Sequence, residues 1–175
     1  MRKQKGFSLI ELLIVVAIIL IIAAIAIPNL MRAKMAANTS SAAASERTIV
    51  TGEIAYFAAF PSIGYTATLA PLGGAWGAAC TPTSATACLI DSNLSTNGNG
   101  NGKSGYTFAV TDVTAAPSLI PNEFVTTGTA LALTTGTTAF CAVDDGVVRT
   151  VAAGAPSNVA VGGYAACQAL NPMAN

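Results

Sequence analysis

The chain has 175 residues, of which 53% are hydrophobic and only 9% are charged, and its formal net charge at pH 7 is zero. Soluble domains carry roughly 25% charged residues, so this composition indicates a large apolar segment. Without the basic residues among the first six, five basic and eight acidic side chains remain, too few positive charges to hold a nucleic-acid backbone. The chain has no histidine, the commonest metal ligand and the usual general base. We therefore expect no enzyme, no metal or other cofactor, and no specific nucleic-acid partner.

An apolar run near the amino terminus spans residues 7–27, with Glu11 as its only charge and Ser8 as its only hydroxyl. At about 1.5 Å per residue, a helix of this length measures roughly 31 Å, the thickness of the hydrocarbon core of a bilayer. A secretory signal peptide has a shorter apolar region and a small-residue cleavage site, neither of which is present here. The sequence predicts a membrane-spanning helix over residues 7–28, with the basic residues 1–6 in the cytoplasm.

Glu11 is out of place in this run. A carboxylate near the centre of a bilayer costs several kcal/mol, so an intramembrane acid is a candidate functional residue. The neighbours of Glu11 are apolar except for Ser8, and the helix is not expected to satisfy the carboxylate locally. An ordinary signal anchor explains the basic start and the apolar length, but it does not explain this acid.

The segment Lys5-Gly6-Phe7-Ser8-Leu9-Ile10-Glu11-Leu12-Leu13-Ile14-Val15-Val16 resembles the processing motif of type IV prepilins. That motif combines a short basic leader, a glycine, a phenylalanine, and a glutamate at the fifth position of the mature chain. The resemblance implies that a prepilin peptidase cuts between Gly6 and Phe7 and methylates the new amine of Phe7. It also implies identical subunits in a helical filament and assembly machinery in the inner membrane. Cleavage would create a positive amine on Phe7 that can pair with Glu11 of a neighbouring subunit, so we expect Glu11 to serve assembly. Pseudopilins of type II secretion share the motif.

Residues 29–60 are rich in alanine and contain one glycine after the proline at position 28, a composition that favours helix. We expect Pro28 to kink or locally open the helix, and Pro61 with Gly64 to end it. The sequence predicts an amphipathic helix that packs on a globular head. Apolar residues at helical spacing are expected on the buried side: Ile49, Val50, Ile54, Phe57 and Phe60. Polar residues are expected on the other side: Glu46, Arg47 and Thr51.

Residues 61–175 are expected to form a β-rich globular head that ends in an extension, residues 152–175. Alternation of apolar and polar side chains predicts a strand at 106–111, and β-favouring residues predict others at 123–133, 138–143 and 147–151. The last two flank Asp144-Asp145-Gly146, a hairpin turn signal. The Asn/Gly run at 97–102 is expected to be flexible. The predicted fold class is α+β, with the long helix on a small antiparallel sheet. The order of these strands resembles the head of short-chain pilins.

Four cysteines, Cys80, Cys88, Cys141 and Cys167, lie beyond the apolar run with no C-x-x-C spacing, which argues against zinc. An even number of cysteines beyond a membrane segment indicates disulfides in an oxidising compartment. Of the three possible connectivities, nearest-neighbour pairing, Cys80–Cys88 and Cys141–Cys167, is the simplest.

Adjacent acids at Asp144 and Asp145, with Asp112 across the expected sheet, could bind calcium, but a turn explains them without a ligand. Three roles remain open at this point. The chain could be the subunit of an extracellular type IV pilus that serves adhesion, twitching motility or DNA uptake. It could instead be a pseudopilin, or a membrane-anchored periplasmic binding domain that does not polymerise. We expect the pilus subunit, held in the inner membrane with a periplasmic head before assembly and extracellular afterwards.

Overall fold

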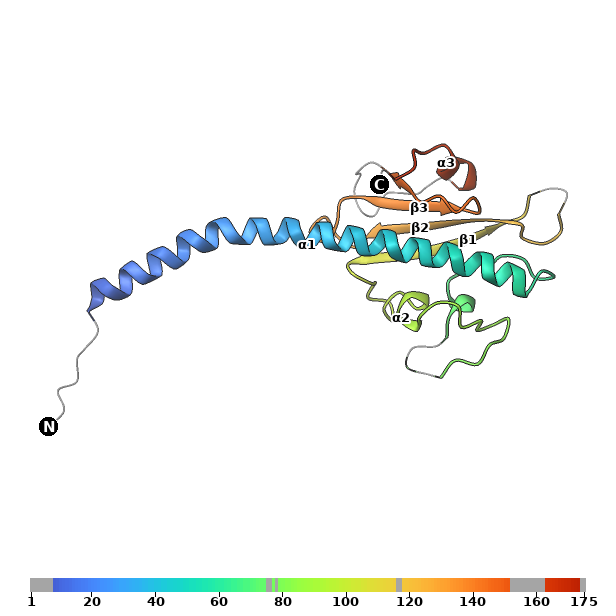
Figure 1. Ribbon diagram of the computed structural model, residues 1–175, viewed down its shortest axis with the longest axis horizontal. Coiled ribbons are helices and arrows are strands. Elements are labelled where there is room, and N and C mark those ends of the chain that lie inside the picture. The colour runs from blue at the N-terminus through green and yellow to red at the C-terminus, as the bar shows by residue number, and fades with distance from the viewer. Residues whose placement is uncertain (1–7, 75–76, 78, 116–117, 152–162, 174–175) are drawn as a thin grey trace. The chain divides into compact units, whose positions relative to one another are not determined.

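The computed structural model describes residues 8–74, 77, 79–115, 118–151 and 163–173 (Figure 1). The chain divides into two units, residues 1–34 and residues 35–175, which are treated separately below. The first helix, α1 (Leu9–Ala59), contributes residues to both. The second unit holds a 3-10 turn, η1 (Ala70–Leu72), and two short helices, α2 (Ser92–Ser95) and α3 (Tyr164–Gln168). It also holds four strands, β1 (Tyr106–Val113), β2 (Glu123–Ala130), β3 (Ala139–Val143) and β4 (Arg149–Val151). The predicted α+β class is confirmed.

Helix α1 passes through Pro28 without a break, so the expected local opening at this residue is wrong. Proline removes only one backbone hydrogen bond, and the alanine-rich sequence on either side favours helix. The helix ends at Ala59, just before Pro61, as the sequence predicts within one residue. Backbone amides of Ile63 and Gly64 then bond the carbonyl of Phe60, at 3.0 and 3.3 Å, and turn the chain. Gly64 has a φ of +92°, a conformation that favours glycine.

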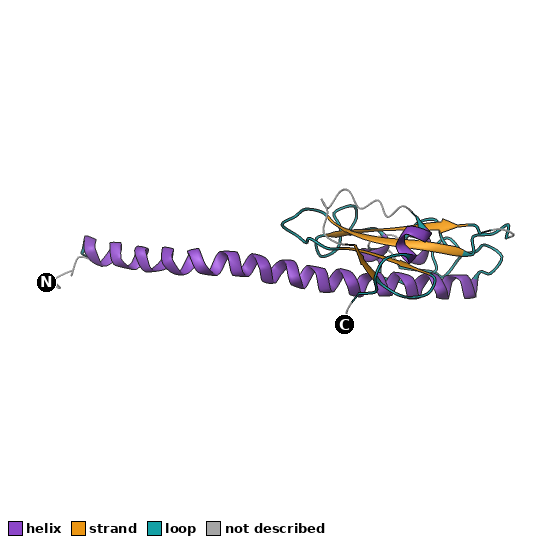
Figure 2. Cartoon of the chain, turned by 90° about the horizontal axis from the view of Figure 1, so that it is seen from above, coloured by secondary structure: helices purple, strands orange, loops and turns teal. Residues whose placement is uncertain are grey.

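The four strands form one antiparallel meander in the order β1-β2-β3-β4 (Figures 1 and 2). All four predicted strands are present, with different ends. The first runs two residues longer than predicted, to Val113, and the second stops at Ala130 instead of residue 133. Beyond Ala130 the amide of Leu131 still bonds the carbonyl of Gly105, in register with the β1–β2 pairing, and the chain then turns through a bond from the amide of Thr135 to the carbonyl of Ala132. The predicted hairpin turn joins β3 to β4, with Gly146 at a φ of +75°.

One face of the sheet packs against the second half of α1 (Figure 2). The helix residues removed from water recur at helical spacing: Ala42, Ala43, Ser45, Glu46, Ile49, Val50, Gly52, Glu53 and Tyr56. Ile49 and Val50 are buried as predicted, and Arg47 and Thr51 are exposed as predicted. Two assignments are wrong, because Glu46 is fully buried whereas Ile54 is 46% exposed. Glu46 lies against the sheet, where its carboxylate accepts a hydrogen bond from the Thr126 hydroxyl of β2.

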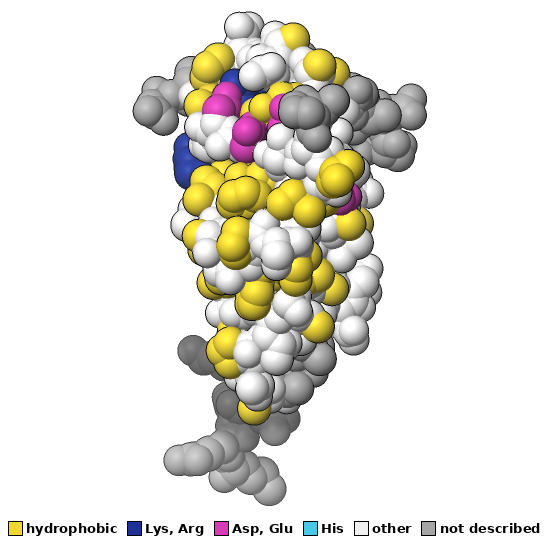
Figure 3. Space-filling model, turned by 90° about the vertical axis from the view of Figure 1, so that its right-hand side faces the viewer, with side chains coloured by type: hydrophobic (Ala, Val, Ile, Leu, Met, Phe, Trp, Pro, Cys, Tyr) yellow, Lys and Arg dark blue, Asp and Glu magenta, His cyan; other side chains and the backbone are white. Residues whose placement is uncertain are grey.

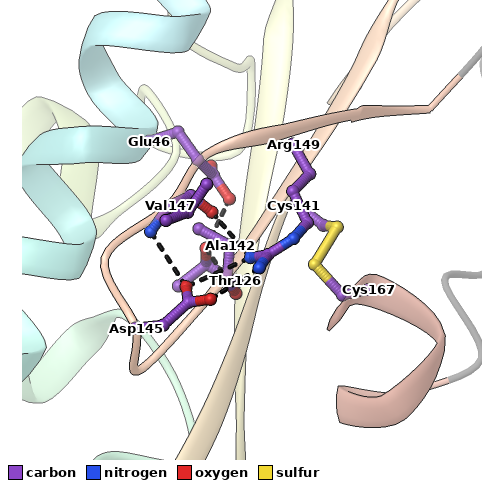
Figure 4. Close-up of a disulfide and its surroundings, with 8 residues drawn as sticks. All are labelled: Glu46, Thr126, Cys141, Ala142, Asp145, Val147, Arg149 and Cys167. Atoms are coloured by element: carbon purple, nitrogen blue, oxygen red, sulfur yellow. Dashed lines mark hydrogen bonds and ion pairs between the residues drawn. A yellow bond between two sulfur atoms is a disulfide. The ribbon is translucent and has the colours of Figure 1, made fainter. Parts of the chain in front are cut away.

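The opposite face of β3 is also covered, by the described part of the carboxy-terminal extension. Every residue of β3 is buried, which places Phe140 and Ala142 in the core beneath α1 and Cys141 in a second cluster. That second cluster contains Val125, Cys141, Val143 and Cys167, with Tyr164 and Leu170 packed against it. Cys141 and Cys167 form a disulfide that fixes α3 to the sheet (Figure 4). The extension is therefore a packed layer of the head where it is described; residues 152–162 lie outside the described part.

The segment between α1 and β1 contains the other predicted disulfide, Cys80–Cys88. Cys141–Cys167 closes a longer loop (sequence separation 26) than Cys80–Cys88 (8), so chain entropy favours it as the more stabilising of the two.

The Asn/Gly run at 97–102 makes specific contacts that the sequence does not suggest. The side chain of Asn97 accepts a hydrogen bond from the amide of Phe108 and donates one to its carbonyl, both at 2.6 Å. One side chain thus takes the place of a neighbouring strand at the open edge of β1. The run is bent onto itself through Asn97, Gly98 and Gly102, all at positive φ. The amide of Gly102 bonds the carbonyl of Asn97 at 2.7 Å.

Asn97→Ala is expected to lower the free energy of unfolding by about 1–3 kcal/mol, because two backbone groups of a buried residue lose their partner. Asn101→Ala is the matched control: its side chain makes only a 3.5 Å contact with Gly98, and its effect should stay within about 0.5 kcal/mol. Thermal or denaturant unfolding of the full chain in detergent measures both. Equal effects of the two substitutions would show that the edge contact contributes nothing.

Candidate functional site

The first part of α1 presents apolar side chains to its surroundings on every side. Among the described residues, this is the helix that is long and apolar enough to cross a membrane. The large side chains from Leu9 to Leu30 are all 47% exposed or more. In water such a surface would aggregate, so it requires lipid or the helices of other protein molecules around it.

Glu11 lies in the first turn of this apolar helix. Its Oε2 accepts a hydrogen bond from the backbone amide of Ser8 at 3.0 Å. The expectation that the helix offers no local partner is therefore wrong. Amides in the first turn of a helix have no carbonyl four residues earlier to bond, and a glutamate three residues after a serine reaches back to satisfy one. The sequence Ser8-x-x-Glu11 carries this signal.

The predicted cleavage and methylation residues, Gly6 and Phe7, lie outside the described residues. The first described residue is Ser8, whose amide nitrogen is part of the peptide bond that joins it to Phe7. Cleavage before Phe7 keeps this peptide bond, so the contact between Ser8 and Glu11 is compatible with the mature chain.

Two further acids that the sequence analysis did not identify as sites lie inside the head, on the buried side of α1. Glu46 accepts a hydrogen bond at 2.5 Å from the Thr126 hydroxyl of β2, and its Oε2 has no partner in the described part of the chain (Figure 4). Glu53 accepts two bonds from Thr66, one from the amide at 3.0 Å and one from the hydroxyl. Neither acid has a cationic partner in the salt bridges of the described residues.

Burial raises the pKa of Glu46 to about 8, because the charged form is removed from water, although the Thr126 hydrogen bond opposes this. Burial likewise raises the pKa of Glu53 to about 7; the bonds from Thr66 lower it, and the negative charge of Asp112 adds a smaller rise. Both groups are carboxylic acids at mildly acidic pH. A spacing of seven residues, two helical turns, places them on one face, and this spacing was the signal available in the sequence.

Two of the three acids considered for calcium, Asp144 and Asp145, have protein partners. Asp145 forms an ion pair with Arg149 at 2.5 Å, and this bond lowers the pKa of Asp145 (Figure 4). Asp144 accepts a hydrogen bond at 2.5 Å from the hydroxyl of Tyr164, which belongs to α3. No group of three or more metal-ligating side chains is found within the described ranges. These acids stabilise the β3–β4 turn and attach the extension to it.

Comparisons with known proteins concern the amino-terminal segment. Residues 1–27 match the family model described as the prokaryotic N-terminal methylation motif. A stretch of 38 residues is 66% identical to the type IV wide pilus major component PilA4 of Thermus thermophilus, and it covers 22% of this chain and 29% of that protein. A stretch of 55 residues is 44% identical to the type IV major pilin protein PilA of Myxococcus xanthus, covering 31% of this chain and 25% of that protein. No solved structure matches the chain.

Through the methylation motif at residues 1–27 and the two aligned stretches, part of the chain is similar to type IV pilus proteins. The aligned stretches cover less than a third of each curated relative. The head of this chain bears few charges. Figure 3, which looks at one end of the molecule, shows apolar and uncharged side chains over most of the visible surface, with charged groups confined to a few places.

The stability of the head should fall as the pH rises, because unfolding releases a proton from each acid whose pKa is raised in the folded state. For Glu46 the unfolded pKa is 4.5 and the folded pKa is about 8, so its contribution is complete below pH 4.5 and is lost as the pH approaches 8. Within this window the free energy of unfolding falls by about 1.4 kcal/mol per pH unit for each such carboxyl. Glu46→Gln keeps an acceptor for the Thr126 hydroxyl but cannot bind the proton. The variant should therefore lose about 1.4 kcal/mol per pH unit of the pH dependence of its free energy of unfolding, the contribution of one carboxyl.

Unfolding of the full chain in detergent, followed at several pH values from 5 to 8, measures this slope. Glu123→Gln is the matched control, since Glu123 lies half-buried at the start of β2, and the wild-type slope should persist. An unchanged slope in Glu46→Gln would show that Glu46 is already ionised in the folded head.

Proposed function

We propose that this chain is the structural subunit of a type IV pilus filament. A peptidase removes residues 1–6, methylates Phe7, and leaves the helix of residues 7–28 to anchor the subunit in the inner membrane and then to polymerise. Residues 29–60 form the amphipathic half of the helix, and residues 61–175 form the head, which is periplasmic before assembly and extracellular afterwards. The observation that carries the proposal is an apolar first part of α1, exposed on every side, that contains one acid, Glu11, within a methylation motif.

The disulfides and the names of the relatives favour a pilus over a pseudopilus. Two intramolecular disulfides suit a durable extracellular fibre, because they persist only where the surroundings are oxidising. Both curated relatives are named as pilins. The subunit has no catalytic role in this proposal. Adhesion, twitching motility and DNA uptake all require the same filament, whose partners are identical subunits, the prepilin peptidase and the assembly machinery of the inner membrane.

Glu11 is the residue that sets the register of the filament in this proposal. Cleavage creates a positive amine on Phe7 at the membrane depth of the carboxylate. Oε2 of Glu11 accepts the hydrogen bond from the Ser8 amide, and Oε1 pairs with the positive Phe7 amine of the incoming subunit. A charge pair in an apolar surrounding relieves two unfavourable charges and depends strongly on distance, so it selects one axial stagger. The apolar side chains around it supply the packing.

The mature chain is expected to begin at Phe7 and to carry one methyl group on its amine. Intact-mass measurement of sheared filaments, before and after reduction, tests this. A mass that retains residues 1–6, or one that corresponds to cleavage beyond Pro28, contradicts the proposed processing.

Glu11→Gln is expected to be cleaved and inserted normally but to form few or no filaments. Glutamine keeps the hydrogen bond to the Ser8 amide and removes the charge, so the variant separates helix capping from charge pairing. Glu11→Leu removes both and should fail in the same way. Val15→Leu, an apolar change one turn further along, is the control and should assemble. Immunoblots report processing and electron microscopy reports fibres. Normal fibres from processed Glu11→Gln would show that the charge pair is dispensable, and loss of cleavage would make Glu11 a recognition residue for the peptidase.

A further inference from the structure

Two segments of the chain match the acceptor motif for N-linked glycans, Asn-x-Ser/Thr with x other than proline. They are Asn38-Thr39-Ser40 and Asn93-Leu94-Ser95. The motif is short and occurs by chance, so its meaning depends on whether the asparagine side chain is available. The structure separates the two segments on this point.

Asn38 is already used by the fold. It lies half-buried in α1, and its side-chain nitrogen donates a hydrogen bond at 2.9 Å to the carbonyl of Thr135. The next residue, Thr39, bonds the carbonyl of Met35 and lies 3.2 Å from the hydroxyl of Tyr106. A glycan on Asn38 would have to occupy the space between the helix and the loop that follows β2.

Asn93 is exposed, and its contacts with the fold are made by its backbone. It is the second residue of α2, which Asp91 caps by accepting the amide of Leu94 at 2.9 Å. The carbonyl of Asn93 accepts the amide of Gly98 at 2.6 Å. Leu94 is fully buried and anchors this turn in the core, so the turn holds the side chain of Asn93 outside the head.

We propose that Asn93 carries an N-linked glycan, an inference that rests on the proposed position of the head outside the cytoplasm. The donor is a lipid-linked oligosaccharide diphosphate, used by a membrane-bound transferase. The side-chain nitrogen of Asn93 forms a bond to the anomeric carbon of the first sugar and loses one proton. The bond from that carbon to the diphosphate breaks, and the lipid diphosphate leaves.

The burial of Ser95 determines at which stage of folding the glycan can be transferred to Asn93. Its hydroxyl, the third position of the motif, is buried and donates to the carbonyl of Gly74 at 3.2 Å. A transferase recognises the motif by this hydroxyl, which is inaccessible to an enzyme in the folded head. Transfer to Asn93 therefore precedes the docking of the 91–96 turn, while the head is still beside the membrane that holds the lipid-linked donor.

Tryptic peptides test the proposal directly, because cleavage at lysine and arginine places the two motifs in different fragments. Residues 35–47 contain Asn38, and residues 48–103 contain Asn93 together with the Cys80–Cys88 bridge. Peptides are taken from the full chain made in its natural cells, from both sheared filaments and membranes. An amidase that releases N-linked glycans converts a modified asparagine to aspartate, which marks the site by mass.

The expected result is a glycan on fragment 48–103, removed by the amidase with aspartate left at position 93, and an unmodified fragment 35–47. Asn93→Gln should lose the glycan completely and keep the fold, whereas Asn38→Gln should retain it. An unmodified Asn93, a glycan on Asn38, or a glycan that resists the amidase and persists in Asn93→Gln overturns the proposal. Filaments that lack the glycan would overturn this inference alone, while a glycosylated chain that forms no filaments would contradict the pilus proposal alone.

Discussion

The head depends on the contact between the second half of α1 and the sheet. Ala42, Ala43, Ile49 and Tyr56 lie in the core with residues of the sheet, and Gly52 faces Ile90 and Leu72 of the segment between α1 and β1. Glu46 and Glu53 are buried on the same side of the helix, where each acid accepts a hydrogen bond from the hydroxyl of a threonine and has no cationic partner among the salt bridges of the described residues. Burial raises the pKa of both acids, so these protons are bound more tightly by the folded head than by the unfolded chain.

One helix therefore meets two opposite requirements along its length. Its first part has apolar side chains on every side and one acid, which suits surroundings of lipid or of other apolar helices. Its second part has an apolar stripe interrupted by acids, which suits burial against a single surface. Because Pro28 does not interrupt the helix, both requirements are met by one continuous element, α1.

The sheet of four strands is small and gains stability from its second face. The described part of the extension that follows β4 covers β3. It is held there by the Cys141–Cys167 disulfide, by the hydrogen bond from the Tyr164 hydroxyl to Asp144, and by the bond from the Met173 amide to the Val148 carbonyl. Small secreted domains commonly replace a large core with covalent links of this kind. At the other edge of the sheet, Asn97 occupies the backbone groups of Phe108, which limits pairing of β1 with another chain at that residue.

The sequence alone determines the elements whose signals are local. The apolar length of α1, the alternation in β1 and the Asp-Gly turn before β4 depend only on neighbouring residues, and each gave the correct element. The cysteines also pair as predicted, although Cys141 and Cys167 are 26 residues apart. The Ser8–Glu11 bond also has a local signal, the Ser-x-x-Glu spacing at the start of a helix. Tertiary structure alone decided the burial of Glu46, the contacts of Asn97 and the packed role of the extension. Each of these depends on a partner elsewhere in the chain: Thr126 for Glu46, Phe108 for Asn97, and Cys141 for Cys167 of the extension. Such a contact contributes to stability only after folding has brought the two residues together.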